Sequence, residues 1–167
     1  MRLWNGWGNE DSDLTMELSD GLRALLEALV GPGTALSQAT LNEVIAKVPN
    51  SRLGDHPLIK TEPEIRVRHA RGQSLPDWLE MHSGNVDTFP DGVAFPESSE
   101  QVRELLAHAK ENNLIVIPYG GGTSVVCHIN PETSDKPVLT IDMVKMNSMF
   151  SIDTESQLAT FGAGAPG

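Results

Sequence analysis

The stretch LIVIPYGGGTS, residues 114–124, decides the fold. Its first four residues, Leu114–Ile117, form a continuous apolar run rich in β-branched side chains, which predicts a strand buried on both faces of a sheet. Three consecutive glycines, Gly120–Gly122, follow shortly after and lack the Cβ that restricts other residues, so the backbone can turn there through positive φ. The stretch therefore predicts a buried strand that ends in a tight glycine turn.

Strand and helix signals on either side extend this stretch into a sheet. Gly92–Phe95 is a short strand candidate, and Ser98 or Ser99 can cap a helix that ends near Asn113. A strand, a helix and a strand in this order predict two parallel strands joined by a right-handed crossover. The expected fold class is therefore α+β with a mixed sheet. Three more strands are expected, at Val138–Asp142, Met149–Asp153 and Leu158–Ala163.

The N-terminal part carries helix signals of its own. Ser19 can cap a helix that ends near Val30, and Thr40 opens a second helix in which Glu43 completes a capping box. Apolar residues recur at helical spacing in both segments, so we expect a helical cover that packs on another part of the protein. Prolines and a glycine punctuate residues 49–65, which indicates a linker.

The glycine turn and its flanks form the candidate ligand site. Successive N–H groups of such a loop can converge on an anion, and the hydroxyls of Thr123 and Ser124 add donors, which suits phosphate oxygens. A P-loop is excluded because no lysine follows the glycines, and a Rossmann fingerprint because no helix is expected after them. A plain tight turn is the alternative interpretation. If the loop binds phosphate, Gly121→Val should abolish ligand retention through a Cβ clash and lost φ freedom. The candidate binding residues are Pro118, Tyr119, Gly120, Gly121, Gly122, Thr123 and Ser124.

Composition limits the classes of partner. The net charge of −11, from 23 acidic and 12 basic side chains, argues against a nucleic-acid partner, because binding to phosphates needs clustered cations. The N-terminus shows no signal peptide, no apolar stretch is long enough to span a membrane, and the single Cys127 excludes an internal disulfide. We therefore expect a cytoplasmic protein. The five histidines show no metal-binding spacing, so no metal site is expected.

Several residues leave two interpretations open. His69 is a functional candidate or a structural residue, and the structural role is favoured. Cys127 lies close to the glycine loop, but a small buried apolar residue is the simpler interpretation. Trp4 and Trp7 are expected to anchor the N-terminal segment by packing. A basic cluster can contact a phosphate or pair with acidic side chains, and pairing is favoured: Arg66, Arg68 and Arg71.

The chain from Phe89 to Gly164 resembles the first half of the FAD-binding domain of the p-cresol methylhydroxylase (PCMH) and vanillyl-alcohol oxidase superfamily. Within it, the chain is most similar to the alkyldihydroxyacetonephosphate synthase family, also called alkylglycerone-phosphate synthase. The resemblance implies an N-terminal helical and irregular segment at residues 1–88 and a truncated PCMH-type domain, with its first βαβ unit, at 89–167. The motifs that carry it are DGVAFP at 91–96, IPYGGGTS at 117–124, WNGWG at 4–8 and RHARGQS at 68–74.

The resemblance also implies a role for the glycine loop. In these families the loop holds the pyrophosphate of FAD, and that role carries over to Pro118–Ser124. Some relatives bind FAD covalently through a histidine in or near this loop. Thr123 stands at that position here, which implies non-covalent FAD, and His128 is the less favoured candidate for a covalent link.

The implied function is the FAD-binding portion of a flavoenzyme that exchanges an acyl chain for a fatty alcohol on a small-molecule substrate of ether-lipid type. Family members continue well beyond this length, so we expect part of a longer enzyme, with the 167-residue chain inactive alone and the catalytic residues unassigned. A bare sheet edge would favour a homodimer. Two alternatives stay open: an FAD-dependent oxidoreductase acting on a 2-hydroxy acid or alcohol, and a non-catalytic interaction module.

Overall fold

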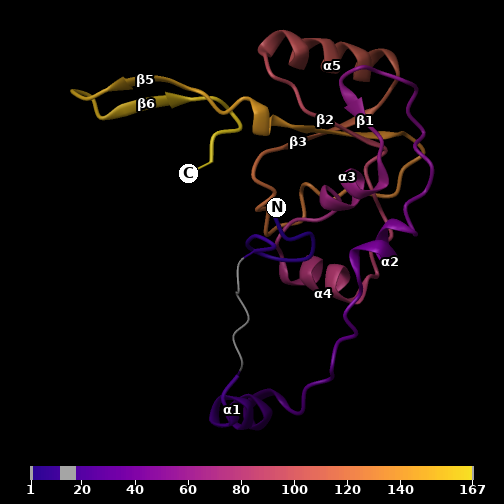
Figure 1. Cartoon of the computed structure of the whole chain (residues 1–167), viewed down its shortest axis with the longest axis vertical. Coiled ribbons are helices and arrows are strands. Elements are labelled where there is room, and N and C mark those ends of the chain that lie inside the picture. Colours follow the sequence, from indigo (N-terminus) through magenta and orange to yellow (C-terminus); the bar gives the residue numbers. More distant parts are fainter. Residues whose placement is uncertain (1, 12–17, 167) are drawn as a thin grey trace.

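A four-stranded mixed sheet forms the centre of the protein (Figure 1). The computed structural model describes residues 2–11 and 18–166. The sheet contains β1 (Ile59–Lys60), β2 (Gly92–Ala94), β4 (Val138–Asp142) and β3 (Ile115–Tyr119), in that spatial order. Strands β2 and β3 run parallel to β4, and β1 runs antiparallel to β2. The predicted α+β class, the mixed sheet and the parallel relation of β2 to β3 are confirmed.

The buried strand at the centre of the sheet is β4, not β3. All five β4 residues are buried, and Thr140 pairs with Val93 on one side and with Ile117 on the other. Strand β3 lies at the edge, where Pro118 is exposed. The prediction that β3 is buried on both faces is therefore wrong. Proline fits this edge because it has no N–H to contribute to a further ladder.

Helix α5 (Ser99–Glu111) connects β2 to β3 and covers the sheet as expected. The Ser98 hydroxyl caps it by accepting from the Gln101 N–H at 3.3 Å. Leu105 and Ala109 are buried, and Leu105 belongs to a core cluster with apolar residues of β1, β2 and β4. The amphipathic pattern thus places this helix on the sheet.

Four further helices precede the sheet strands or lie between them. They are α1 (Asp20–Val30), α2 (Leu41–Ile45), α3 (Pro63–Arg68) and α4 (Leu75–Ser83). Helix α2 has the predicted capping box, and its Val44 is fully buried in a cluster with apolar residues of α3 and α4. Helix α1 is capped by Ser19 but has no buried residue, so the prediction of a packed cover holds for α2 and fails for α1.

The segment predicted as a linker contains regular structure. Residues 49–65 include β1, which pairs with β2, and the start of α3. Two residues of strand are too short for a periodicity signal, which is why β1 was not expected. Because β1 joins the sheet, the sheet draws residues from both sides of position 88. The division at residue 88 stays a prediction.

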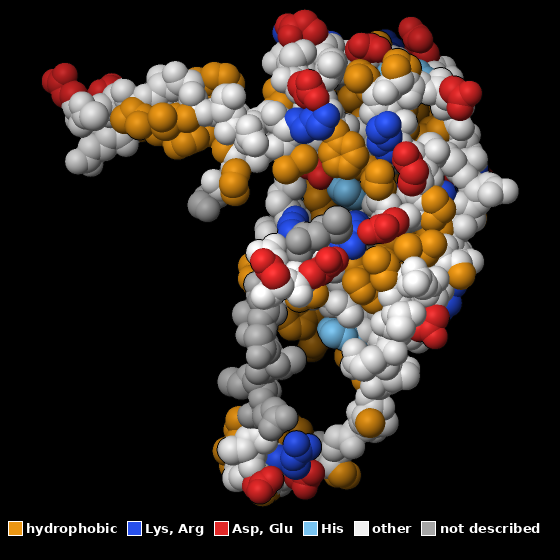
Figure 2. All heavy atoms as spheres, in the orientation of Figure 1, with side chains coloured by type: hydrophobic (Ala, Val, Ile, Leu, Met, Phe, Trp, Pro, Cys, Tyr) orange, Lys and Arg blue, Asp and Glu red, His pale blue; other side chains and the backbone are white. Residues whose placement is uncertain are grey.

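A two-stranded hairpin extends from the sheet after a short 3-10 helix, η1 (Met143–Lys145). It contains β5 (Met149–Asp153) and β6 (Leu158–Phe161), as predicted, although β6 ends two residues early. The Asp153 carboxylate accepts from the N–H groups of Glu155 and Ser156, which forms the turn. All residues of both strands are exposed, and Figure 2 shows hydrophobic side chains gathered along this arm.

One ion pair ties three segments of the sheet region together. The Asp91 carboxylate accepts from Arg52 Nε at 2.9 Å and Nη2 at 2.7 Å, and from the Val138 N–H at 2.7 Å. Burial opposes ionisation of Asp91, but these hydrogen bonds outweigh it and hold its pKa below the usual value of 3.8. The ionised carboxylate therefore joins the segment before β1 to the starts of β2 and β4.

We expect Asp91→Asn to lower the free energy of unfolding at pH 7 by about 2 kcal/mol, the scale of hydrogen bonds to a buried charge. Because folding lowers the pKa, the contribution is present above the unfolded pKa and is lost as pH falls through the folded pKa. Urea unfolding at several pH values should therefore show a loss of stability below about pH 4 that is smaller in the variant. Asp55→Asn, at an exposed position, is the control. Equal pH dependence in Asp91→Asn and wild type would contradict this role.

Candidate functional site

A cavity of about 960 Å³ lies at the carboxyl ends of β3 and β4. Three segments that are far apart in the sequence line it: the N-terminal loop at residues 2–9, the glycine loop after β3, and residues 163–166. Side chains of the α3–α4 region, including His69 and Gln73, complete the wall. A smaller cavity, of about 350 Å³, lies along residues 53–61 and contains none of the predicted site residues.

The structure brings part of the predicted site into this cavity. Of the seven predicted binding residues, four line the cavity: Tyr119, Gly120, Gly121 and Thr123. Pro118, Gly122 and Ser124 lie beside the cavity lining, where Gly122 is buried. Four of the seven predicted residues therefore line the cavity, and the role of all seven in binding stays a prediction.

The three glycines have different roles. Only Gly122 has a positive φ, of 68°, and a Cβ there would overlap the hydroxyl of Tyr119. At Gly120 no atom lies within 4 Å of an added Cβ, and at Gly121 the nearest is Thr123 Cγ2, at 3.5 Å. The φ constraint expected at Gly121 is therefore wrong, because Gly122 has the positive φ, whereas the effect of Gly121→Val on ligand retention stays a prediction. An added Cβ at Gly120 or Gly121 meets no close protein atom, and both residues line the cavity.

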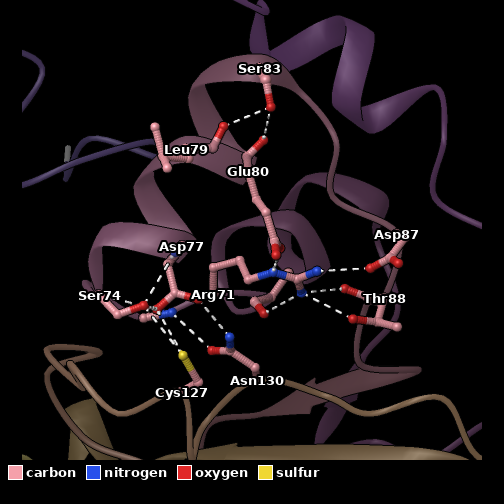
Figure 3. Close-up of polar contacts among 12 residues, drawn as sticks. Arg71, Ser74, Asp77, Leu79, Glu80, Ser83, Asp87, Thr88, Cys127 and Asn130 are labelled. Carbon is pink, nitrogen blue, oxygen red and sulfur yellow. Dashed lines mark hydrogen bonds and ion pairs between the residues drawn. The ribbon is translucent and has the colours of Figure 1, made fainter. Parts of the chain in front are cut away.

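A segment from residues 72–77 braces the glycine loop. The Gln73 N–H donates to the Ser124 carbonyl at 2.6 Å, and the Gly72 N–H donates to Asn130 Oδ1 at 3.1 Å. Asn130 in turn donates through Nδ2 to the buried Asp77 Oδ1 at 2.6 Å (Figure 3). A Cβ at Gly72 would overlap the Ser124 carbonyl, so glycine allows this close approach. The sequence pattern did not indicate this brace.

Asp77 is held in place by the start of α4. The Ser74 hydroxyl caps the helix, and Asp77 Oδ2 accepts from the N–H and hydroxyl of Ser74 at 3.0 Å and 2.7 Å. Figure 3 shows Cys127 pointing toward this pair, with Sγ 3.3 Å from Ser74 Oγ. Cys127 is nevertheless an exposed residue with a φ of 60°, so its expected burial is wrong.

His69 has a structural role, as favoured. Its Nδ1 lies 2.7 Å from the Ile65 carbonyl, and its Nε2 lies 2.9 Å from Asp142 Oδ2 at the end of β4. Each ring nitrogen thus lies within hydrogen-bond distance of a protein acceptor, which fixes the ring between α3 and the end of β4. The ring also lies 4.6 Å from the ring of Tyr119, between centroids. Burial raises the pKa of Tyr119, which keeps its hydroxyl protonated at neutral pH.

The basic cluster pairs with protein groups. Arg68 contacts Glu64 at 2.9 Å and Glu10 at 3.0 Å, and Arg71 contacts Glu80 and Asp87. The ion-pair interpretation is confirmed for these two arginines. The buried Arg66 instead donates to the backbone carbonyls of Pro90 and Pro49, and burial lowers its pKa.

The remaining candidates lie outside the cavity lining or differ in burial. His128 is exposed, and its Nδ1 lies 3.0 Å from Ser124 Oγ. Trp4 and Trp7 both line the cavity. Trp4 also packs against the cluster around Val44, as expected of an anchor, whereas Trp7 is 54% exposed.

Within residues 2–11 and 18–166, no group of three or more potential ligands is arranged to hold a metal ion. No helix of that described part is long and apolar enough to cross a membrane.

We expect Gly122→Ala to destabilise the protein by about 2 kcal/mol or more, because it combines left-handed strain with overlap against Tyr119. Gly120→Ala is the matched control, since its added Cβ meets open space, and its effect should stay within about 0.5 kcal/mol. Thermal and urea unfolding of both variants measure the difference. Equal stability of the two variants would show that Gly122 does not carry the conformational constraint.

Comparison with known proteins places this geometry in a family. Residues 90–167 match the family described as FAD binding domain. Alkyldihydroxyacetonephosphate synthase from Dictyostelium discoideum is 32% identical over 109 residues, which are 65% of this chain and 18% of the synthase. A solved structure of an alkyldihydroxyacetonephosphate synthase superposes with a TM-score of 0.72 at 25% identity, over 95% of this chain and 35% of that one. The chain therefore spans a minor part of these relatives.

Two other relatives widen the comparison. Protein Rv2250A of Mycobacterium tuberculosis is 32% identical over 104 residues, covering 56% of this chain and 68% of that protein. The mitochondrial D-lactate dehydrogenase (cytochrome) 1 of Saccharomyces cerevisiae is 31% identical over 90 residues, covering 53% of this chain and 15% of the dehydrogenase. From the matched domain, the shared fold and these relatives, residues 90–167 form an FAD binding domain, whose cofactor is FAD, and the chain resembles the N-terminal portion of alkyldihydroxyacetonephosphate synthase.

Proposed function

We propose that the glycine loop binds the pyrophosphate of FAD non-covalently in the large cavity. The observation that carries this is the open face of the loop: Gly120 and Gly121 line the cavity, and nothing lies within 4 Å of the position where a Gly120 side chain would begin. Because Gly120, Gly121 and Thr123 line the cavity, their backbone N–H groups and the Thr123 hydroxyl would be the donors to the phosphate oxygens. The residues present thus fit a pyrophosphate.

The neighbouring residues would hold the loop in its binding shape. Gly122 makes the turn over the Tyr119 hydroxyl, and Ser124 is fixed through its carbonyl by the Gln73 N–H. Pro118 lies near the end of the edge strand, one residue before its last residue, Tyr119. We therefore assign direct contact with the phosphates to Gly120, Gly121 and Thr123, and positioning to the other four predicted residues.

At the level of the whole enzyme, we propose an FAD-dependent activity of the alkyldihydroxyacetonephosphate synthase type, to which this chain contributes the FAD-binding portion. The similarity to the Dictyostelium discoideum synthase and to the synthase structure supports this. The flavin, when bound, would supply the reactive centre for exchange of an acyl chain for a fatty alcohol without net redox change. The residues of this chain would bind and orient the cofactor.

The alternative is an FAD-dependent oxidoreductase that acts on a 2-hydroxy acid. The similarity to the D-lactate dehydrogenase of Saccharomyces cerevisiae favours it. Both proposals share the same cofactor site, so the glycine loop does not discriminate between them. An interaction module without flavin is the outcome if no FAD binds.

The first test is titration of the 167-residue protein with FAD, ADP and riboflavin by calorimetry. If the loop recognises pyrophosphate, FAD and ADP bind and riboflavin, which has no phosphate, does not. Gly120→Val should abolish binding because its side chain occupies the open face, while its unfolding midpoint stays at the wild-type value. Gly54→Val, which also meets open space but lies in the smaller cavity, is the matched control. Absence of FAD and ADP binding to the wild type would overturn the assignment.

The second test separates the two enzyme proposals. The form of the gene product that retains flavin is mixed anaerobically with D-lactate and D-2-hydroxyglutarate, and the visible flavin band is followed. The synthase proposal predicts that the band persists with both acids. Rapid bleaching by either acid would favour the oxidoreductase.

A further inference from the structure

The N-terminal loop lines the same cavity as the exposed glycines. Residues 2–9 fold back on themselves: Arg2 and Asn9 form an antiparallel bridge, and the Leu3 N–H donates to the Gly8 carbonyl at 3.0 Å. Gly8 makes the turn with a φ of 106°. The loop is therefore a closed local structure that presents its outer residues in a fixed arrangement.

Arg68 attaches this loop to α3. Its Nη1 donates to the Arg2 carbonyl at 2.8 Å and its Nη2 contacts Glu10 at 3.0 Å, while Nε donates to Glu64 at 2.9 Å within α3. One guanidinium thus contacts both ends of the loop and its own helix. Lysine lacks the planar guanidinium fork whose separate nitrogens reach these three acceptors, because its three donors lie on one nitrogen.

The two tryptophans of the loop lie in different environments. Trp4 packs against the apolar cluster around Val44 and so attaches the loop to that cluster. Trp7 is 54% exposed and lines the same cavity as Gly120 and Gly121. An exposed indole on a braced loop that shares a cavity with a phosphate-binding backbone is suited to stacking on a planar ring, since such contacts need a rigid aromatic face.

We propose that Trp7 is the stacking residue for a planar heteroaromatic ring of the nucleotide ligand, and that Arg68 is the residue that positions it. This rests on the proposed binding of pyrophosphate at the glycine loop. The ligand then has two recognition elements in one cavity: backbone N–H groups for the phosphates and an indole face for a ring. Arg68 also lines the cavity, but its guanidinium nitrogens already donate to Glu64, Arg2 and Glu10, so the role proposed for it is to position the loop.

The test measures FAD and ADP affinity by calorimetry for Trp7→Ala and Trp7→Phe, with unfolding midpoints recorded for each variant. Trp7→Ala should weaken FAD binding by about tenfold, the effect of one lost base–aromatic stack, and Trp7→Phe should retain most of the affinity. Phe150→Ala, which removes an exposed aromatic side chain from β5, is the matched control and should bind as wild type. A parallel loss for ADP identifies the ring as adenine, and a loss for FAD alone identifies it as isoalloxazine.

The role of Arg68 has its own readout. Arg68→Ala and Arg68→Lys should each weaken FAD binding, but Arg68→Ala in the Trp7→Ala background should add no further loss, because Arg68 acts through Trp7. FAD affinity in Trp7→Ala within twofold of wild type would overturn this inference and leave the glycine-loop proposal standing, provided that Gly120→Val abolishes binding. If the wild type binds neither FAD nor ADP, both proposals fall together.

Discussion

The candidate site depends on a backbone-to-backbone contact between two loops that meet beside the cavity. The Gln73 N–H reaches the Ser124 carbonyl at 2.6 Å, which is feasible because Gly72 has no Cβ to overlap that carbonyl. Asn130 reinforces the contact, because it accepts from the Gly72 N–H and donates to the buried Asp77. An accessible glycine loop would otherwise sample many conformations, so this brace restricts the loop to one shape, as the proposed binding of an anion requires.

The same region is tied to the sheet through buried polar groups. His69 joins α3 to Asp142 at the end of β4, and its ring packs on Tyr119 at the end of β3. Tyr119 in turn underlies Gly122. A continuous set of contacts therefore runs from the buried centre of the sheet to the turn that faces the cavity, so the position of the loop is set by the most rigid part of the fold.

Local signals were sufficient for part of the fold, and non-local packing decided the rest. The Ser98 cap and the spacing of Leu105 and Ala109 predicted α5 well, because both act within one helix. Strand β1 was too short to show a period, and the burial of β4 instead of β3 depends on strand order, which periodicity does not report.

At the candidate site, the three consecutive glycines in the sequence indicated the loop, but they did not indicate that each glycine has a different conformation and environment. A positive φ at Gly122 results from the Tyr119 side chain beneath it, a contact that no local pattern reveals. The exposure of Trp7 was missed for a similar reason: Trp4 and Trp7 share a motif, and only the docking of the loop separates their environments.

The distance in sequence between the partners of the brace also bears on how the site is assembled during folding. Asn130 contacts Gly72 and Asp77 across 58 and 53 residues, a span that includes β2, α5 and β3. Closing so long a loop is entropically costly until the intervening strands and helix are in place. We therefore expect the brace to form late and cooperatively with the sheet, so that a partly folded chain would present its glycines without the shape that the proposed ligand binding requires.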